Sequence, residues 1–250
     1  MASTANQVQS IDHWIAGKDA PPKGQKYFPV NNPLDDAVIA NAAAGSVDDI
    51  NRAVESAHEA FKTFRNTLPK EREKILCKSA ELLERDRNDF IEILVDEIGS
   101  PIKKAGFEVE KGLSFLRAAA GMARQVTGKT IPSDAPGKFS MSIRSPLGVV
   151  AAITPFNVPL IKGTRLSCNP IAVGNTVVMM PSEESPILAN RLARLYAEAG
   201  LPDGVFNVVS GNGYEIGDAL TTHPDVKMVT FTGSCVVGQH IRELCGKHDK

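Results

Sequence analysis

The chain lacks the features that mark a membrane, secreted or nucleic-acid-binding protein. No uninterrupted apolar run in its 250 residues approaches the about 18 residues that a membrane-spanning helix needs. The first twelve residues show neither the basic start nor the apolar stretch of a secretory signal. The formal net charge is only −1, which gives no support for binding nucleic acid or another highly charged surface. We therefore expect a cytoplasmic protein with no membrane and no nucleic-acid partner.

Cysteine and histidine are too few and too scattered to suggest a disulfide scaffold or a metal centre. The four cysteines show no C-x-x-C pairing, and a chain of this length needs no disulfides to fold. The five histidines do not have the spacing of metal ligands. We expect reduced thiols and no metal site.

The amino-terminal half has helical patterns that follow an irregular start. Residues 1–45 predict short strands and turns, and Ser46 is placed to cap a helix that runs to Phe64. A second apolar face begins at Pro69 and continues to Leu94, although Arg87 interrupts it. A third helix is expected to begin with Ser100 as its cap and Pro101 in its first turn. Residues 127–145 contain glycines and prolines and then alternate apolar with polar residues, which predicts a strand or a hairpin.

The carboxyl-terminal part alternates short apolar strands with helices. Strands are expected at 148–153, 176–180, 205–209 and 226–231, each followed by a helix. Ser185 is placed to cap the helix that begins at Pro186. Four such units predict an α/β fold with a doubly wound parallel sheet, whose ligands bind at the carboxyl ends of the strands. We expect an amino-terminal helical part at 1–126, a protruding hairpin at 127–145 and the sheet domain at 146–250.

The segment at 231–238, Phe-Thr-Gly-Ser-Cys-Val-Val-Gly, joins the last strand to a helix. Gly233 allows close backbone approach, and the N–H groups at the start of the helix favour a phosphate. Its glycine spacing is neither G-x-G-x-x-G nor a P-loop. On spacing alone, it could equally be a tight turn with a glycine that packs against the helix.

Pro181, Ser182 and Glu183 follow the second strand. A carboxylate at this place can accept hydrogen bonds from the ribose of an adenosine. The alternative is a solvated glutamate in the first turn of a helix, where the helix dipole favours it.

Two prolines flank Asn157 in the segment 154–159, directly after the first strand. An amide held in this way can donate a hydrogen bond to a developing oxyanion. The alternative is an Asx-turn or a helix cap.

Taken together, these segments resemble the aldehyde dehydrogenase superfamily. The strings that carry the resemblance are 145–150 leading into 153–157, 174–178 before 181–183, and 231–234. Upstream, Asn32-Pro33, Ala60-Phe61 and 97–100 are also similar to that family's amino-terminal part. The resemblance covers almost the whole chain, and its strings keep one order and spacing. It implies a Rossmann-like fold and the oxidation of a small-molecule aldehyde to a carboxylic acid with NAD or NADP as cofactor.

The resemblance also implies roles for individual residues. Asn157 would help to stabilise the thiohemiacetal oxyanion, Glu183 would contact the ribose, and Gly233 and Ser234 would contact the pyrophosphate. The hairpin at 127–145 would help to form a homo-oligomer. The residues implied to bind the cofactor are Ile153, Thr154, Pro155, Phe156, Met180, Glu183, Gly213, Gly217, Phe231, Thr232, Gly233, Ser234 and Val237.

Two departures from the family pattern qualify this expectation. Met180 replaces a lysine that contacts the ribose in many relatives, so the choice between NAD and NADP stays open. The family's general-base glutamate and nucleophilic cysteine would lie beyond the position of Lys250. We therefore expect a chain truncated before the catalytic domain and inactive by itself. The alternatives are a non-catalytic nucleotide-binding fragment or subunit, and an aldehyde dehydrogenase that transfers the acyl group to coenzyme A.

Overall fold

The computed structural model describes residues 8–250. Residues 1–7, which include most of the segment searched for a signal and the start of the 1–126 region, lie outside the described residues. No helix between residues 8 and 250 is both long enough and apolar enough to cross a bilayer.

A six-stranded sheet forms the centre of the molecule, in the order β11-β8-β9-β10-β2-β3. Its four neighbouring parallel strands are β8 (Val149–Ile153), β9 (Thr176–Met180), β10 (Phe206–Val208) and β11 (Val226–Phe231). These are the four strands predicted from the sequence, and the α/β fold class is confirmed. The short strands expected within residues 1–45 include β2 (His13–Ile15) and β3 (Lys18–Ala20), and their antiparallel pairing with the central sheet was not predicted. Strands of three residues are too short to show a periodic pattern.

The strand order reverses direction between β8 and β11. The chain runs from β8 to β9 to β10 towards one edge and then returns to place β11 on the other side of β8. Along this path it forms α5 (Pro159–Ala172), α6 (Pro186–Glu198), α7 (Gly213–Thr222) and, after β11, α8 (Cys235–Lys247). Such a reversal leaves a crevice outside the carboxyl ends of the two strands.

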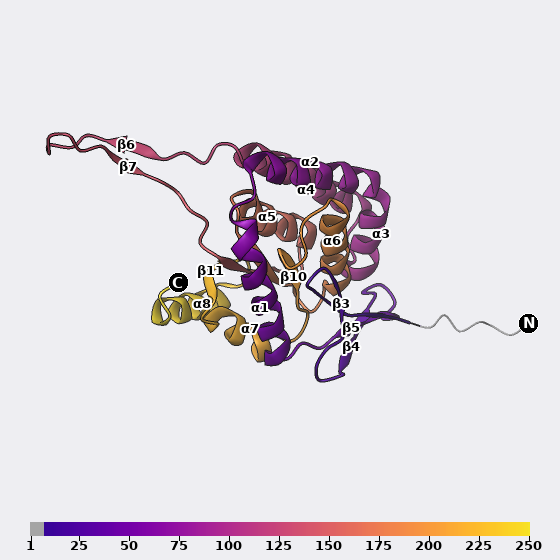
Figure 1. The fold of residues 1–250 in the computed structure, drawn as a ribbon. Coiled ribbons are helices and arrows are strands. Elements are labelled where there is room, and N and C mark those ends of the chain that lie inside the picture. The colour runs from indigo at the N-terminus through magenta and orange to yellow at the C-terminus, as the bar shows by residue number, and fades with distance from the viewer. Residues whose placement is uncertain (1–7) are drawn as a thin grey trace, which may run out of the picture.

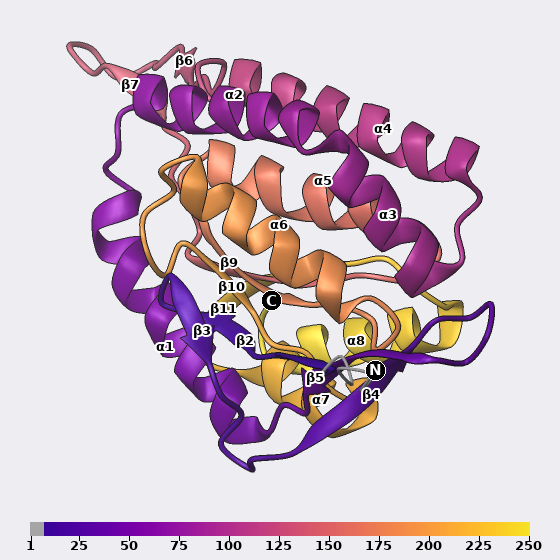
Figure 2. The ribbon, with the colours of Figure 1, turned by 90° about the vertical axis from the view of Figure 1, so that its right-hand side faces the viewer.

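Helices cover both faces of the sheet. Along β8, Ala152 belongs to the core on the side of α5 and α6, whereas Ala151 and Ile153 belong to the core on the side of α7 and α8. This alternation follows from the two-residue period of a strand. The second face is also covered by α1 (Val47–Phe64), and Figure 2 shows the layers above and below the sheet.

The three helices that follow α1 form a further layer on α5 and α6. Ser46 caps α1 as predicted, with Asp49 completing a capping box. The single helix expected from Pro69 to Leu94 is wrong, because the structure divides it into α2 (Pro69–Arg85) and α3 (Arg87–Ile98). The break is at Asp86, whose carboxylate binds Arg85 and Arg191. The hydrogen bond from Arg85 is the main reason that the pKa of Asp86 is lowered to about 2, and Arg191 adds to the effect. The third helix, α4 (Ile102–Met122), is present.

Two buried glutamates cap the helices that follow β8 and β9. Glu97 accepts the N–H groups of Ile187 and Leu188 at 2.6 and 3.0 Å, at the start of α6. Glu108 accepts the N–H of Leu160 at 3.2 Å, at the start of α5, and also binds Lys104. Because side-chain carboxylates from α3 and α4 satisfy these N–H groups, the amino-terminal layer is fixed to the sheet domain.

The caps predicted at Ser100 and Ser185 are therefore corrected. Ser185 occupies the cap position of α6 but makes no capping hydrogen bond with its side chain, since Glu97 already takes the first N–H groups. Pro101, not Ser100, is the cap residue of α4, and the Ser100 hydroxyl instead accepts a bond from Lys104.

Two smaller sheets lie at the periphery. One has the order β1-β5-β4, with β1 (Gln9–Ile11), β5 (Val38–Ala43) and β4 (Tyr27–Asn31). The other is the predicted hairpin, in which β6 (Lys129–Ile131) pairs with β7 (Ser140–Ser142). Figure 1 shows this hairpin extending far from the rest of the protein.

We expect Glu97 to make stability fall as the pH rises. Burial raises the pKa of Glu97 to about 8, so the folded protein holds this proton more tightly than the unfolded chain does. Between about pH 5 and pH 8 the free energy of unfolding should therefore fall by at most about 1.4 kcal/mol per pH unit. Denaturant titrations across this range measure the slope.

The variant Glu97→Gln should flatten that slope because its side chain does not titrate. Glu92→Gln changes an exposed residue of the same helix and serves as the control. An unchanged slope in Glu97→Gln would show that other groups cause it.

Candidate functional site

A cleft with a volume of about 640 Å³ lies at the carboxyl edge of the sheet. This volume is within the range of about 300–1,000 Å³ typical of cofactor sites. The ends of β8, β9 and β11 form its floor, and α7 and α8 form its walls. The parallel register places Phe231, Ile153 and Met180 in one row across the three strands. The cleft therefore lies where the strand order reverses, as the fold requires.

All thirteen residues implied to bind the cofactor line this cleft. They come from four separate stretches of the chain, and the sheet brings them together. They are Ile153, Thr154, Pro155, Phe156, Met180, Glu183, Gly213, Gly217, Phe231, Thr232, Gly233, Ser234 and Val237. Their contact with a nucleotide stays a prediction.

Further residues of α7 and α8 line the cleft and were not predicted from the sequence. Thr221 lies four residues after Gly217 on α7, and Ile241 lies four residues after Val237 on α8, so helical spacing could have found them. At the same walls, Asp218 of α7 and His240 of α8 form a pair with 2.8 Å between Oδ1 and Nε2. The remaining missed residues are Pro181, Ser182, Gly211, Tyr214 and Val236.

The start of α8 is built to receive an anion. Ser234 is the cap residue, and its hydroxyl accepts the N–H of Val237 at 3.3 Å. A β-carbon on Gly233 would lie 2.5 Å from the ring of Phe231, and one on Gly238 would lie 3.2 Å from it. Both glycines are thus needed for packing against Phe231, and the first turn of the helix is left exposed at the cleft. The segment 231–238 therefore fits both interpretations of its sequence. Its glycines pack closely against Phe231, and the N–H groups at the start of α8 are exposed at the cleft.

Met180 and Glu183 connect the second strand to α7. The Met180 methyl would lie 3.6 Å from a β-carbon on Gly217 and 4.0 Å from one on Gly213, so it fills the space over these glycines. The Glu183 carboxylate accepts the N–H of Gly213 at 2.9 Å. Glu183 therefore lies at the cleft in a fixed position, in a turn before α6 and not in its first helical turn.

Asn157 lies beside the cleft and does not line it. It is exposed in the loop between β8 and α5, and its amide makes no hydrogen bond to another residue in the range 8–250. The cap residue of α5 is Val158, so the helix-cap alternative is wrong. The amide is available to an external acceptor, and its role in catalysis stays a prediction.

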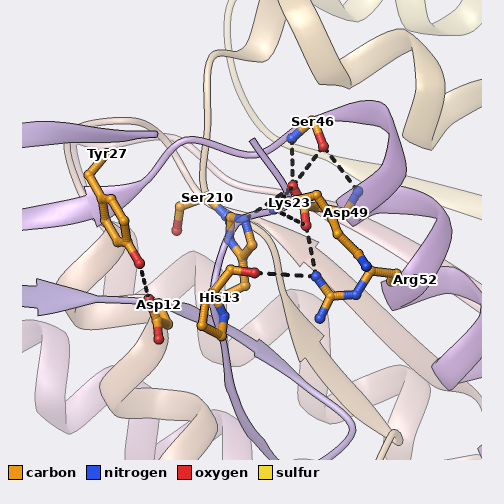
Figure 3. Close-up of polar contacts among 9 residues, drawn as sticks. Asp12, His13, Lys23, Tyr27, Ser46, Asp49, Arg52 and Ser210 are labelled. Atoms are coloured by element: carbon orange, nitrogen blue, oxygen red, sulfur yellow. Dashed lines mark hydrogen bonds and ion pairs between the residues drawn. The ribbon is translucent and has the colours of Figure 1, made fainter. Parts of the chain in front are cut away.

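A buried polar network surrounds Asp49 near the start of α1 (Figure 3). The Asp49 carboxylate accepts the N–H of Lys23 and the N–H and hydroxyl of Ser46, and pairs with Arg52 at 3.0 Å. Burial alone would raise the pKa of Asp49, but these contacts and the nearby His13 hold it well below its usual range.

His13 connects this network to the loop that leads into α7. Its Nε2 lies 3.7 Å from Asp49, and its Nδ1 accepts the N–H of Ser210 at 3.3 Å. The Ser210 carbonyl in turn accepts the N–H of Gly45 at 2.9 Å. Gly211, the next residue along the chain, lines the cleft. The start of α1 and the cleft wall are therefore held as one unit.

We expect Asp49→Asn to lower the free energy of unfolding by about 2 kcal/mol at neutral pH, because buried donors lose their charged acceptor. The fold stabilises the charged form of Asp49. The difference in the free energy of unfolding between wild type and the variant should therefore narrow as the pH falls below about 4. Denaturant titration measures both effects. Asp48→Asn, at the exposed neighbouring position, is the control, and an equal loss there would contradict the assignment.

The four cysteines are far from forming a common site. Cys77 and Cys235 are exposed on α2 and α8, and all four are free thiols. Cys168 is buried, and burial raises its pKa to about 12, which makes it a poor nucleophile. Within residues 8–250 no group of three or more histidine, cysteine, aspartate or glutamate side chains is placed to hold a metal ion.

A family model described as "Aldehyde dehydrogenase family" matches residues 20–250. The chain belongs to the aldehyde dehydrogenase family. One solved relative is described as NAD-dependent and another as a complex with NAP. The exposed N–H groups of α8, the carboxylate of Glu183 and the glycines of α7 fit the diphosphate, ribose and adenine of such a nucleotide.

Relatives of the chain are known in sequence and in structure. The chain is 39% identical over 239 residues to a vanillin dehydrogenase from Pseudomonas fluorescens, covering 94% of this chain and 49% of that protein. It is 38% identical to malonate-semialdehyde dehydrogenase 1 from Geobacillus thermodenitrificans, covering 97% and 50%. The crystal structure of an NAD-dependent benzaldehyde dehydrogenase from Corynebacterium glutamicum superimposes with a TM-score of 0.91 at 36% identity, covering 94% and 51%. The chain thus spans about half the length of these relatives.

Proposed function

We propose that this chain is the nucleotide-binding portion of an NAD(P)-dependent aldehyde dehydrogenase that oxidises an aldehyde to a carboxylic acid. The main support for this proposal is that all thirteen residues expected to bind the cofactor line one cleft. That cleft lies where the strand order reverses between β8 and β11. The relatives are named for vanillin and malonate semialdehyde, so an aldehyde substrate is the property they share.

Each part of the cleft suits one part of the nucleotide. The N–H groups of the first turn of α8 would bind the diphosphate, with Ser234 holding that turn in shape. Glu183 would accept the ribose hydroxyls, and it already accepts a hydrogen bond from Gly213 at the start of α7. The adenine would lie near the start of α7, where Gly213 and Gly217 line the cleft.

Asn157 would act on the aldehyde itself. When bound, the nicotinamide supplies a hydride acceptor. The Asn157 amide would donate a hydrogen bond to the oxygen of the aldehyde as negative charge develops there. Its position at the end of β8, next to the Thr154 and Phe156 wall of the cleft, supports this role. One such donor typically contributes a factor of roughly 10²–10³ to the rate.

The protruding hairpin would join copies of the protein into a homo-oligomer. Its large apolar side chains are exposed to an extent unusual for a monomer surface, with Phe139 75% and Ile143 77% exposed. Ile131 and Met141 add to this surface, at 50% and 58%. A hairpin of this kind is stable only when it packs against another surface.

We expect NAD to bind the purified chain and Ser234→Asp to weaken that binding about tenfold or more. Aspartate is as good a helix cap as serine, so α8 should keep its shape, but its charge would repel the diphosphate. Gln239→Glu adds the same charge to the same helix at a position that does not line the cleft, and it is the matched control. Calorimetric titration with NAD and NADP measures the affinities. Equal weakening in both variants, or no binding to wild type, would contradict the proposal.

We also expect the 250-residue chain to bind NAD without oxidising any aldehyde. Cys168 is buried with a raised pKa, and none of the other three cysteines lines the cleft. The formation of reduced nicotinamide, followed by its absorbance with benzaldehyde or succinate semialdehyde, is the measurement. Sustained turnover by the chain alone would prove this expectation wrong.

A further inference from the structure

The two helices that form the walls of the cleft are joined by a polar pair, Asp218 of α7 and His240 of α8. The Asp218 Oδ1 lies 2.8 Å from the His240 Nε2, and both residues line the cleft. Their side chains are 61% and 51% exposed, so a bound molecule can reach them, whereas the neighbouring lining residues Thr221 and Ile241 are buried. We call the pair the rim pair. Neither of its members is among the thirteen residues implied to bind the cofactor.

Exposed apolar side chains lie beside the rim pair. Tyr214 is one helical turn before Asp218 on α7, so both are on the same face of that helix. Val236 has the same relation to His240 on α8. Tyr214 and Val236 also line the cleft and are 94% and 77% exposed. Such a surface suits a flat ring system with one polar edge, because the ring covers the apolar side chains and the edge meets the rim pair.

The rim pair lies in the part of the cleft where the nucleotide base is expected. His240 is six residues after Ser234, about 9 Å along α8 from the N–H groups that would bind the diphosphate. On the other wall, Asp218 directly follows Gly217, which lines the cleft where the adenine would lie. A base attached through its ribose to that diphosphate therefore comes within reach of both members of the pair.

The Asp218 carboxylate determines which nitrogen of His240 carries the proton. An ionised carboxylate only accepts hydrogen bonds, so a neutral imidazole donates its one N–H from Nε2, the nitrogen that faces Asp218. The Nδ1 of His240 then has a lone pair and accepts. Neither this Nδ1 nor the Asp218 Oδ2 makes a hydrogen bond to another residue in the range 8–250. Both free polar atoms of the rim pair are therefore acceptors, and they require a donor on the ligand.

We propose that Asp218 and His240 recognise the edge of the nucleotide base and select adenine by its 6-amino group. This inference rests on the proposed function, since it takes the cleft as the nucleotide site. The amino group donates its N–H groups to the two acceptors of the rim pair. Hypoxanthine has a carbonyl oxygen at the same ring position, so an acceptor would face the carboxylate and the interaction would be repulsive. The rim pair determines specificity for the base through binding and takes no part in the chemical step.

The test compares NAD with nicotinamide hypoxanthine dinucleotide, in which the 6-amino group of the base is replaced by a carbonyl. Calorimetric titration of the full chain at about pH 8, where an ordinary histidine is neutral, measures both affinities. We expect wild type to bind NAD about tenfold more tightly than the hypoxanthine analogue.

Two variants of the rim pair should reduce this ratio to about threefold or less. The amide of Asp218→Asn can turn to donate or to accept, and His240→Phe keeps a ring but removes one acceptor. Glu215→Gln removes the same charge from α7 at an exposed position that does not line the cleft, and it is the matched control, which should keep the wild-type ratio.

Three results would overturn the inference while leaving the nucleotide site intact. These are equal affinities of wild type for the two dinucleotides, an unchanged ratio in Asp218→Asn, and an equal reduction of the ratio in Glu215→Gln. If wild type binds neither dinucleotide, the proposed function fails and the inference fails with it. Thermal unfolding of each variant checks the fold, which should be unchanged because an exposed ion pair contributes little to stability.

Discussion

The reversal of strand order between β8 and β11 determines where the cleft lies. The helices that follow β8 and β11 lie on opposite faces of the sheet. A gap is therefore left between them, outside the ends of the two strands. The gap that results is bordered by strand ends on one side and by the exposed first turn of α8 on the other. The topology thus places the exposed N–H groups of α8 at the gap, and side chains such as Glu183 add further polar groups there.

Buried side chains from the part of the chain before the hairpin hold the elements around this gap in place. Glu97 and Glu108 satisfy the first N–H groups of α6 and α5, and the Asp49–His13 network holds the loop before α7. Three buried acids from three different helices therefore stabilise the elements that carry the cleft and the Asn157 loop. Their protonation states differ because their surroundings differ: Asp49 has many donors, whereas burial dominates at Glu97.

The sequence predicts the cleft well because its residues follow strands that are easy to recognise. The apolar strands ending at Ile153, Met180 and Phe231 are continuous and bounded by turn residues, so the residues after them must meet at one edge. The capping role of Glu97 could not be predicted, because its partner Ile187 is 90 residues away. The same holds for His13, which pairs with Ser210, and for the helix break at Asp86, which Arg191 stabilises. Local patterns contain no information about such distant partners.

The caps from Glu97 and Glu108 also bear on how such a protein can be rearranged. The sheet with its helices resembles an independent module, yet two of those helices begin with N–H groups that only α3 and α4 satisfy. Cutting the chain at the hairpin would remove the acceptors of these donors and would also expose the apolar faces of α5 and α6 that α2, α3 and α4 cover. A chimera that exchanged the sheet alone between relatives would inherit this defect, so the unit that can be transplanted includes the helices that precede it.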